Sequence, residues 1–421
     1  KAIIVMGLYI GFMVAQKVVE ETLAERAELP TEWSNCPMCG AKLRSKGLVK
    51  RQIHSLVGLI HWRRRVGRCP NRCEIGQIAP LEEQLAITPY QQGSFELCEI
   101  ACLLAVFIPY DTVAKILTKL FPLQINGMTI WNWVQYFGEI AIANLQQELN
   151  LLGEGVFPNV EDTVEAFSQL PLIIGADGVQ APFRPQQGSP AGKTVWKEVK
   201  VAILARLHYL RTPGGQIATK LEHRRLVAVL GDVDALQPRL WLEALRQGIL
   251  ETPEVVWLSD GGRGFWTIFN ACFASLAVGI LDFYHAIQNL WKAAAAWFDG
   301  RTIHARQWFA LTRHRIRQGH VDVVLAELRR ARNNPQITEN ARKTISNFYE
   351  YLNKHQRHML YSVFKDSFGY PIGSGVVESA CKWLIQQRFK GVGMRWSKHG
   401  FNNLLHLRLA WTNERFERVF Q

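Results

Sequence analysis

The sequence predicts a multidomain α/β protein whose central domain is a mixed β-sheet flanked by helices. The chain has 421 residues, of which 48% are hydrophobic, so it can form two to four globular domains. Between residues 170 and 290, three expected strands are followed by alternating helices and strands, an order typical of one mixed sheet covered by helices. Outside that region, helical patterns surround one short module rich in cysteine and basic residues.

Residues 1–30 are expected to form an N-terminal helix. The apolar run at residues 2–15 is shorter than a membrane span and no small-residue cleavage site follows it, so we expect the start of a packed helix and no membrane segment. Because the chain begins with Lys1 rather than Met, we also expect that its natural N-terminus lies further upstream.

Residues 31–80 are expected to form a zinc ribbon. Two short cysteine motifs, C-P-M-C and C-P-N-R-C, provide the ligands Cys36, Cys39, Cys69 and Cys73. Four thiolates on two tight turns can surround Zn²⁺, which then substitutes for the hydrophobic core that so short a module lacks. The segment "IHSLVGLIHWRRRV" predicts two strands around Val57-Gly58. The second motif has three residues between its cysteines instead of two, so His54 and His61 remain alternative ligands.

The charge of the chain favours an anionic partner, nucleic acid before a membrane surface. The net charge is +13 and the pI is about 9.4. Between Trp33 and Cys73 there are ten basic residues and no acidic one: Lys42, Arg44, Lys46, Lys50, Arg51, Arg63, Arg64, Arg65, Arg68 and Arg72. We therefore expect a DNA-binding ribbon with Arg63, Arg64 and Arg65 as contacts, although basic ribbons can also bind proteins.

The eight cysteines do not form the pattern of a disulfide scaffold in a chain of this length. Such cysteine usage suits a reducing compartment, so we expect a protein of the cytoplasm or the nucleoid and not a secreted one.

Residues 81–155 are expected to form a helical DNA-binding domain of the helix-turn-helix type. Two short helical patterns are followed by a turn with Asn126-Gly127 and by a helix that begins near Thr129. An ordinary small helical domain would give a similar pattern. Residues 155–170 have the composition of a linker.

Two aspartates occupy equivalent positions in the expected sheet. Asp177 in "IIGADGV" and Asp260 in "VVWLSDGG" each follow an apolar strand and precede a glycine. Ligand-binding groups gather at the carboxyl edges of such strands, so the two carboxylates are candidate metal ligands. A turn or a helix cap would be the simpler explanation for either aspartate alone.

Glu378 is the third candidate carboxylate. It opens the amphipathic helical part of the segment 371–396, whose apolar stripe consists of Val377, Cys381, Leu384 and Ile385, with Ser374 as a candidate cap. An ordinary acidic residue in a first helical turn is the alternative. Three carboxylates that converge in a basic protein suit Mg²⁺ or Mn²⁺, and two such ions can activate a nucleophile at a phosphodiester. The basic residues that follow are candidate DNA contacts: Lys382, Arg388, Lys390 and Arg395.

Four segments together resemble a known protein family. "GADGVQ", "LSDGGRGFW", "LDFYHA" and "PIGSGVVESACKWLIQQRFKGVGMRWS", in that order over roughly 170–400, are similar to bacterial DDE insertion-sequence transposases of the ISKra group, which are related to Mutator-like elements. The Asp-x-x-His of "LDFYHA" (Asp282 and His285) is a Mutator-like hallmark. For His285 a structural role, a proton shuttle or a DNA contact remain open.

The resemblance implies a ribonuclease H-like core divided into residues 170–290 and 369–421 by a helical insertion at 291–368. It also implies that Asp177, Asp260 and Glu378 hold Mg²⁺ or Mn²⁺ and that the protein cuts the ends of a mobile element and joins the 3′-OH to target DNA. Its partners would be transposon ends, target DNA and at least one further copy of the chain. The alternatives are a catalytically silent DNA-binding protein and a metal-dependent nuclease without joining activity.

The expected insertion is rich in aromatic and basic residues that could stack on unpaired bases near the cut. An ordinary helical core with solvated basic faces explains the same composition equally well. The residues concerned are Trp291, Trp297, Trp308, Arg313 and Arg315.

Overall fold

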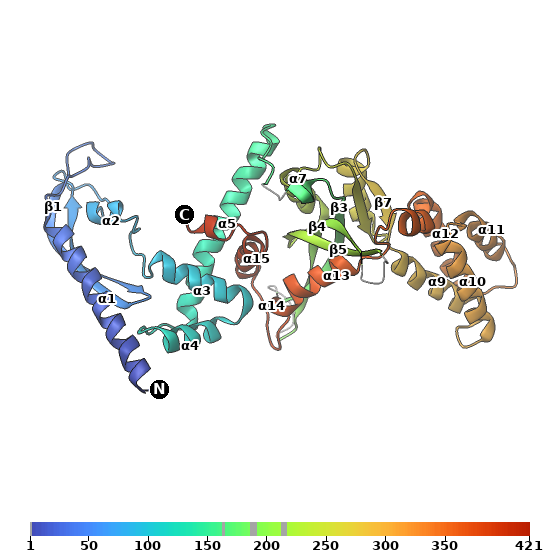
Figure 1. Cartoon of the computed structure of the whole chain (residues 1–421), viewed down its shortest axis with the longest axis horizontal. Helices are drawn as coiled ribbons and strands as arrows, with labels where there is room; N and C mark the ends of the chain where they lie inside the picture. The colour runs from blue at the N-terminus through green and yellow to red at the C-terminus, as the bar shows by residue number, and fades with distance from the viewer. Residues whose placement is uncertain (1, 162–164, 186–191, 212–216) are drawn as a thin grey trace. The chain divides into compact units, whose positions relative to one another are not determined.

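The computed structural model describes residues 2–161, 165–185, 192–211 and 217–421 (Figure 1). The chain forms two compact units, one of Lys1–Ile140 with Phe416–Gln421 and one of Ala141–Arg415. The boundary at Ile140 lies inside helix α5 (Gly127–Gly153), whereas the sequence predicts that the helical domain ends at residue 155.

The first unit consists of helices and one β-hairpin. Strands β1 (Arg44–Ser55) and β2 (Gly58–Arg68) are antiparallel, and Ser55 pairs with Gly58 across the turn. The two strands predicted around Val57-Gly58 are therefore confirmed. The helices of this unit are α1 (Ala2–Glu28), α2 (Pro80–Gln84), α3 (Phe95–Phe107), α4 (Tyr110–Leu120), the first part of α5 and the terminal turn η5 (Glu417–Val419).

Helix α1 is present as predicted, but its first half is not packed. Ile3, Met6 and Ile10 are exposed, whereas Ala27 near the other end is buried. Among the described residues, α1 is a helix long and apolar enough to cross a membrane by length and composition, with a mean hydropathy of 1.6 in its best window. The expected helix over residues 1–30 is therefore confirmed in its extent, but the expectation that it is packed was wrong for its first half, which the fold leaves exposed.

Helices α3, α4 and α5 follow one another as the sequence predicted. The side-chain oxygen of Ser94 accepts a hydrogen bond from the Leu97 amide at 3.4 Å and caps α3. Asn126 Oδ1 accepts one from the Thr129 amide at 3.0 Å and so fixes the start of α5. Three helices with two short connections fit a helix-turn-helix domain, and any DNA-binding role for it stays a prediction.

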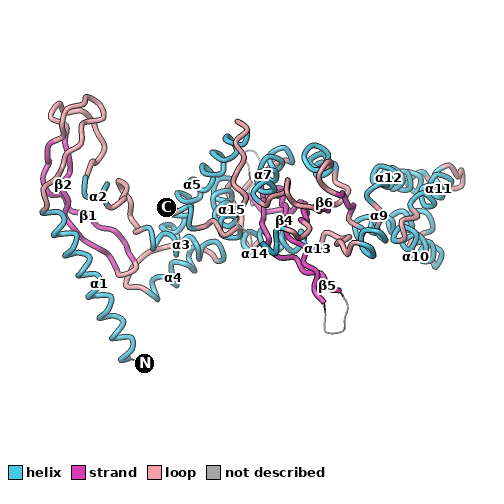
Figure 2. The backbone as a smooth tube through the Cα atoms, turned by 45° about the horizontal axis from the view of Figure 1, so that its top comes forward, coloured by secondary structure: helices cyan, strands magenta, loops and turns pink. Residues whose placement is uncertain are grey.

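The second unit is built on one five-stranded mixed sheet (Figure 2). The strand order is β5-β4-β3-β6-β7, with antiparallel pairing from β3 to β5 and parallel pairing from β3 to β7. The strands are β3 (Leu172–Phe183), β4 (Val195–Arg211), β5 (Ile217–Val229), β6 (Val255–Ser259) and β7 (Val278–Leu281). The predicted mixed sheet is confirmed, with the first strand of this unit at its centre.

Helices cover this sheet and continue into a helical bundle. Helix α7 packs on β4 and β5, α13 packs on β3 and β4, and α15 packs on β5. One hydrophobic core runs from the sheet into helices α9 to α12. The helices are α6 (Glu165–Ser168), α7 (Val233–Arg246), α8 (Arg263–Ile268), α9 (Phe283–Phe298), α10 (Ile303–Arg317), α11 (Val321–Arg332), α12 (Glu339–His355), α13 (Gly375–Cys381), α14 (Gln387–Phe389) and α15 (Lys398–Thr412).

Five short helical turns were not visible as such in the residue pattern. They comprise three π-helical segments, η1 (Phe269–Phe273), η3 (Val363–Ser367) and η4 (Lys382–Gln386), and the 3₁₀ turns η2 (Gln356–His358) and η5. The segment η4 directly continues α13, so that the helix predicted within residues 371–396 changes its hydrogen-bond spacing after Cys381.

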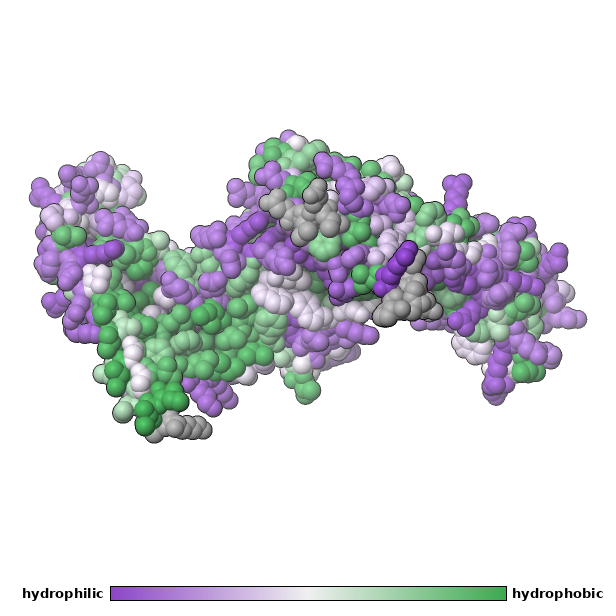
Figure 3. Space-filling model, in the orientation of Figure 1, coloured by the Kyte–Doolittle hydropathy of each residue, from purple (hydrophilic) through white to green (hydrophobic). Residues whose placement is uncertain are grey.

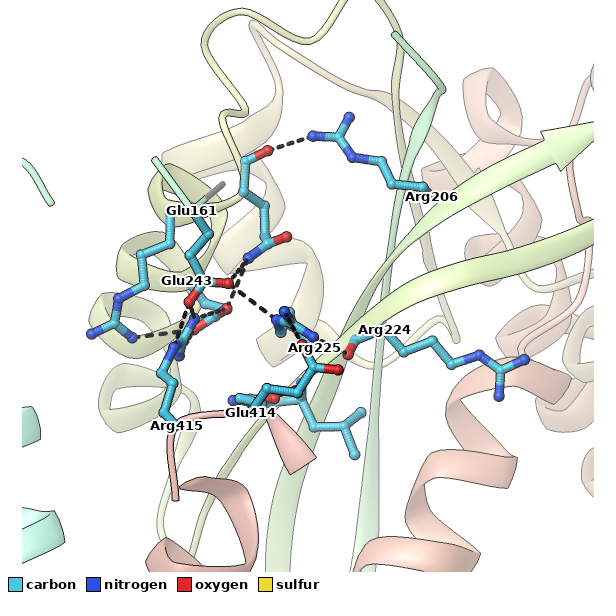
Figure 4. A network of polar contacts seen from close by, with 11 residues as sticks. Glu161, Arg206, Arg224, Arg225, Glu243, Glu414 and Arg415 are labelled. Carbon is cyan, nitrogen blue, oxygen red and sulfur yellow. Dashed lines mark hydrogen bonds and ion pairs between the residues drawn. The ribbon is translucent and has the colours of Figure 1, made fainter. Parts of the chain in front are cut away.

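A buried network of ion pairs joins distant segments of the second unit (Figure 4). The guanidinium of Arg415 donates to both carboxylate oxygens of Glu243 on α7, at 2.7 and 2.8 Å, and to Glu161 at 2.6 Å. Arg225 on β5 donates to Glu161 at 3.1 Å and to Glu414 at 2.8 Å. Burial raises the pKa of Glu161, but Arg415 and Arg225 outweigh it and hold that pKa below its ordinary value of 4.5.

Replacing Arg415 with alanine should lower the stability of the second unit by about 3–5 kcal/mol, because two largely buried carboxylates lose their shared partner. The thermal unfolding midpoint measures the effect. Arg301→Ala is the matched control, since its pair with Asp299 is exposed and should leave the midpoint unchanged.

The stabilisation should also depend on pH. Since Glu161 has a lowered pKa in the folded chain, its contribution is fully present above pH 4.5 and is lost as the pH falls through the lower, folded value. The difference between wild type and Arg415→Ala should therefore shrink on acidification; a constant difference would contradict this assignment.

Candidate functional site

Asp177 lies in β3, at the point where the neighbouring parallel strand stops. The sequence predicts Asp177 at the end of its strand, but β3 continues to Phe183 because β4 pairs with it over its whole length. The parallel partner β6 ends with Ser259 opposite Ala176. Asp177 is therefore the first residue of β3 beyond the carboxyl end of β6, which keeps it at the predicted edge although not at a strand end.

The glycine after Asp177 lies next to the flexible side chain of Glu198 on β4. The Gly178 amide donates to Asp177 Oδ1 at 2.7 Å. A Cβ at position 178 would lie 2.0 Å from an oxygen of Glu198 on β4. A larger side chain at position 178 would therefore displace only the end of the Glu198 side chain, and the amide of Gly178 holds the Asp177 carboxylate.

Asp260 directly follows β6, as the sequence predicted. Its Oδ1 accepts a hydrogen bond from the Gly262 amide at 2.9 Å, and its carbonyl oxygen accepts one from the Trp266 indole at 2.6 Å. A Cβ on Gly261 would collide with the ring of Tyr351 on α12, at 2.0 Å. The turn that carries Asp260 is therefore held by α8 and by a helix of the bundle.

Glu378 lies on α13, which covers the face of the sheet to which Asp177 points. A Cβ added to Gly175 would lie 3.4 Å from the Cβ of Val377, so position 175 faces α13. Side chains two residues apart in a strand point to the same face of the sheet, and Asp177 therefore also points toward α13. The Ser374 hydroxyl donates to Glu378 Oε1 at 3.4 Å, and Glu378 itself is exposed. The predicted apolar stripe is confirmed, since all four of its members are buried: Val377, Cys381, Leu384 and Ile385.

The three carboxylates interact electrostatically. Burial raises the pKa of Asp177 above its ordinary value, and the charges of Asp260 and Glu378 raise it further, while the Gly178 amide and His285 lower it. Repulsion between the three carboxylates favours the binding of a cation. Carboxylate oxygens are preferred by hard cations such as Mg²⁺. Among the described residues, the carboxylate oxygens do not all lie within 4.8 Å of one another, so a single ion shared by all three needs side-chain rotation.

Asp282 connects His285 to the start of the helix that carries Glu378. Asp282 follows β7 and is buried; its Oδ1 accepts from the His285 amide at 3.0 Å, and its Oδ2 accepts from the Ser374 amide at 2.8 Å. His285 Nδ1 lies 3.2 Å from the same Oδ2. Burial raises the pKa of Asp282, but hydrogen bonds from His285 and Ser374 outweigh it and lower the pKa to about 2.

His285 is positioned next to the carboxylates. Its hydrogen bond to Asp282 raises the pKa of His285 against the opposing effect of burial, and the charges of Asp260 and Asp177 raise it further. The sequence singles out His285 but leaves its role open. The link from His285 through Asp282 to Ser374 was not predicted. The hydrogen bond between the Ser374 amide and Asp282 joins residues 92 positions apart, which no local sequence pattern reveals.

The four predicted cysteines form one cluster in the first unit. The sulfur atoms of Cys36, Cys39, Cys69 and Cys73 all lie within 4.8 Å of one another. A tetrahedral zinc site with Zn–S bonds of about 2.3 Å needs sulfur atoms about 3.8 Å apart, so the cluster has the size of such a site and could bind zinc. His54 and His61, the alternative ligands, are not part of it.

Crowding perturbs the thiols of the cluster. The Cys39 and Cys69 sulfur atoms are 3.4 Å apart. Hydrogen bonds to Cys39 and Cys69 raise the pKa of Cys73 to about 12, whereas a hydrogen bond from the Ala41 amide and others from the cluster lower that of Cys39 to about 6. A bound metal replaces the thiol protons of such a set.

Two of the predicted DNA contacts are buried. Arg64 is 2% exposed and donates to Glu82 at 2.7 Å and to the carbonyl oxygens of Val49 and Lys50. Arg388 is 2% exposed and lies over the ring of Trp396 at 5.4 Å. Both predictions are corrected, because these arginines hold the fold together and cannot reach a phosphate in this conformation.

The other predicted DNA contacts reach the surface. Arg63, Lys382 and Arg395 are exposed, and Arg65 and Lys390 are partly exposed. Lys390 lies over the ring of Trp196 at 5.7 Å, and Arg395 donates to the Gly192 carbonyl at 3.0 Å.

In the helical bundle, Trp297 and Trp308 pack in the hydrophobic core, whereas Trp291 is exposed. Trp308 is buried and donates to Glu327 at 2.9 Å, and Trp297 packs against it with ring centroids 5.3 Å apart. Arg315 pairs with the same Glu327 at 3.0 Å. Trp291 and Arg313 remain exposed. The core explanation therefore holds for Trp297 and Trp308, and the stacking role stays open for Trp291 and Arg313.

Comparison with known proteins gives similarities among solved structures but no matching family. No protein-family model matches the chain, and no curated protein matches it either. The solved structure of the Drosophila P element transposase strand transfer complex aligns with 80% of this chain and 95% of that chain, at 12% sequence identity and a TM-score of 0.35.

Proposed function

We propose that the chain is a DNA transposase that cleaves the ends of a mobile element and transfers the resulting 3′-OH to target DNA. The proposal is supported most by Asp177 in β3 and Asp260 after β6, which lie at the same edge of the mixed sheet. Glu378 lies on α13, which packs on β3, and its charge raises the pKa of Asp177. The sequence motifs around these residues support it, since they resemble those of DDE transposases. A ribonuclease H-like core is the fold class that this resemblance implies for the sheet.

The three carboxylates have the donor set for Mg²⁺ or Mn²⁺. Asp177 and Asp260 each use one oxygen for a backbone amide, and among the described residues the second oxygen of each has no hydrogen-bond donor. Two divalent cations held there would supply a metal-activated water or 3′-OH and stabilise the leaving oxygen of a phosphodiester. The carboxylates themselves fix the place of the reaction, and His285 adds a nearby group that can hold a proton.

The basic residues provide the means to hold DNA. On the hairpin, Lys50 pairs with Arg63 and Arg44 pairs with Arg68 across the two strands. Like charges directly opposite each other destabilise a hairpin unless an anion lies between them. A DNA backbone would supply that anion, while Lys382 and Arg395 would contact DNA next to Glu378.

The proposal is tested with the purified full chain, Mg²⁺ and labelled DNA that carries the element's ends. We expect nicks at the ends, followed by strand-transfer products. Nicks without joining would favour a nuclease, and binding without nicks would favour a DNA-binding protein. The basic hairpin by itself supports the candidate of a non-catalytic DNA-binding protein, because its charges can bind DNA without any cleavage activity. DNA affinity should also fall steeply with salt, since phosphate contacts release counterions.

Asp282→Asn should lower the cleavage rate about 10- to 100-fold, as expected for a group that orients a metal ligand. Asparagine keeps the size of Asp282 but offers only one acceptor oxygen, so it cannot serve both the His285 and Ser374 amides together with the His285 ring. The start of α13 should then loosen, and with it the position of Glu378.

The readout is the Mg²⁺ concentration that gives half-maximal cleavage, which should rise in Asp282→Asn and be partly restored by excess Mn²⁺. A purely structural role would lower the amount of folded protein without shifting this concentration, and that result would remove Asp282 from the site. Asp299→Asn is the matched control, since Asp299 flanks the other end of α9 and pairs only with the exposed Arg301.

A further inference from the structure

The helical bundle contacts the sheet edge at the turn that carries Asp260. On the face of the bundle shown in Figure 3, hydrophilic residues predominate, in purple at the right. Apolar and aromatic residues of the bundle lie inside, in the core that it shares with the sheet. Two aromatic residues of this shared core touch the Asp260 turn, namely Tyr351 and Trp266. The reaction proposed above assigns no role to either of them.

The ring of Tyr351 on α12 occupies the space that a side chain at position 261 would need. A Cβ added to Gly261 would lie 2.0 Å from Cε2 of this ring and 2.9 Å from both Cδ2 and Cζ. No side chain fits at position 261 unless the ring moves. The φ angle of Gly261 is negative, so the glycine is required by the ring and not by a left-handed backbone conformation.

Tyr351 lies within electrostatic reach of two carboxylates of the candidate site. Burial raises the pKa of the Tyr351 phenol, and the charges of Asp260 and Asp282 raise it further. Asp260 is the candidate metal ligand after β6, and Asp282 joins His285 to the start of α13. The ring of Tyr351 therefore connects the bundle to the part of the sheet edge where a metal would bind.

Trp266 on α8 holds the same turn by a hydrogen bond. Its indole N–H donates to the Asp260 carbonyl oxygen at 2.6 Å. The indole ring packs against two imidazoles of the bundle, with centroid distances of 4.9 Å to His355 and 4.3 Å to His358. His358 Nδ1 donates to the Gly279 carbonyl oxygen on β7 at 3.0 Å, which ties the end of the bundle helix to the sheet.

Burial keeps these two imidazoles neutral near pH 7. It lowers the pKa of His355 to about 4, and it lowers the pKa of His358 against the opposing effect of the hydrogen bond to Gly279. Neutral imidazoles pack on the indole as aromatic rings and add no positive charge near Asp260. A cation bound to Asp260 would therefore not be repelled by them.

The turn needs such contacts, because two glycines follow Asp260 directly. Glycine has more conformational freedom than any other residue, so Gly261 and Gly262 alone would not hold the aspartate in one place. Within the turn, the carboxylate is fixed by one hydrogen bond from the Gly262 amide at 2.9 Å. A metal ligand has to be placed to within about 0.5 Å, and loss of a group that orients a ligand commonly weakens metal binding about 10- to 100-fold.

We propose that Tyr351 and Trp266 are positioning residues that hold the Asp260 carboxylate where it binds Mg²⁺ or Mn²⁺. Tyr351 fixes the turn through its contact with Gly261, and Trp266 fixes it through the Asp260 carbonyl oxygen. The helical bundle is then a part of the metal site, because it supplies Tyr351 and the two imidazoles behind Trp266. The inference rests on the proposed function, since it takes Asp260 to be a metal ligand.

Exchange of side-chain size between positions 261 and 351 tests the contact of the ring with the turn. The readout is the dissociation constant of Mn²⁺ for the full chain without DNA, from the electron paramagnetic resonance of free Mn²⁺, counting only the binding that Asp260→Asn removes. Gly261→Ala should raise this constant about 10- to 100-fold, because the new methyl group displaces the ring. Tyr351→Ala should raise it similarly. In the Tyr351→Ala background, Gly261→Ala should change it less than threefold, since the ring is already absent.

Tyr351→Phe is the matched control for the ring. It keeps the carbon atoms that contact position 261, so the dissociation constant of Mn²⁺ should change less than twofold.

Trp266→Phe tests the hydrogen bond to the Asp260 carbonyl oxygen. Phenylalanine keeps an aromatic ring in contact with the imidazoles but has no N–H donor, so the dissociation constant of Mn²⁺ should rise at least fivefold. The Mg²⁺ concentration for half-maximal DNA cleavage should rise in parallel. Trp308→Phe is the matched control, because Trp308 also loses an indole hydrogen bond, to Glu327 at 2.9 Å, but lies in the bundle core. Its effect on both values should stay below twofold.

Two results would overturn the inference and leave the proposed function standing. The first is a wild type that binds Mn²⁺ and cleaves DNA while Gly261→Ala and Trp266→Phe do both equally well. The second is an equal effect of Trp266→Phe and Trp308→Phe, as a general loosening of the core would give. A wild type that neither binds Mn²⁺ through Asp260 nor cleaves DNA would overturn both proposals. If Tyr351→Ala lowers the unfolding midpoint too far for measurement, Gly261→Ala and Trp266→Phe decide the question.

Discussion

Asp260→Asn should abolish Mg²⁺-dependent cleavage of element ends, by about 10³-fold or more, and leave DNA binding intact. Asparagine can still accept the hydrogen bond from the Gly262 amide through Oδ1, so the turn after β6 keeps its shape. What is lost is the negative charge and the second oxygen, the features that would hold a divalent cation. The effect should therefore appear in the chemical step and not in affinity for DNA.

Asp177→Asn and Glu378→Gln should give losses of the same order, because the three residues act as one set of ligands. Asp322→Asn is a suitable control: it replaces an exposed aspartate in the first turn of α11, away from the sheet edge. Each rate is measured under single-turnover conditions with labelled DNA ends, next to a binding assay on the same DNA. Normal cleavage by Glu378→Gln would disprove the proposed triad, and loss of binding would point to misfolding.

The sequence was sufficient to predict the sheet and much of the candidate site. Period-two and apolar runs predicted the strands, and Asp260 lies directly after one of them as expected. The position of Asp177 within its strand was not predictable, because it depends on the pairing of β3 with β4 through Phe183. Residue patterns report local structure, whereas the length of a strand is also set by a partner that is distant in the sequence.

The side-chain roles of the basic residues were the least predictable part. Arg63, Arg64 and Arg65 look equivalent in the sequence, but strand alternation turns Arg64 inward, where Glu82 neutralises it. Arg388 is similarly withdrawn beneath Trp396. A charge pattern predicts an anionic partner for the surface as a whole, and only the fold decides which arginines remain available to it.

Removal of the metal that we propose for the cysteine cluster should unfold the module at residues 31–80. Its own core is small: Cys36, Leu43 and Cys69 are buried, with Trp33, Cys73, Ile75 and Ile78 packed against them. Structural zinc contributes about 10–16 kcal/mol of apparent binding energy in isolated zinc-finger peptides, far more than such a core supplies. Purified protein should contain one zinc per chain, and a strong chelator should release it together with loss of hydrogen-exchange protection in β1 and β2.

Cys69→Ser should reproduce this loss without a chelator, because Cys69 is buried at the centre of the cluster and serine is a poor zinc ligand. Cys272→Ser is the matched control, since Cys272 lies in η1 of the other unit and outside the cluster, so zinc content should stay at one per chain. Protection in β3 and β4 should persist in both variants, because those strands belong to a separate core. Metal-free protein with a fully protected hairpin would contradict the assignment, since the hairpin would then be stable without the ion.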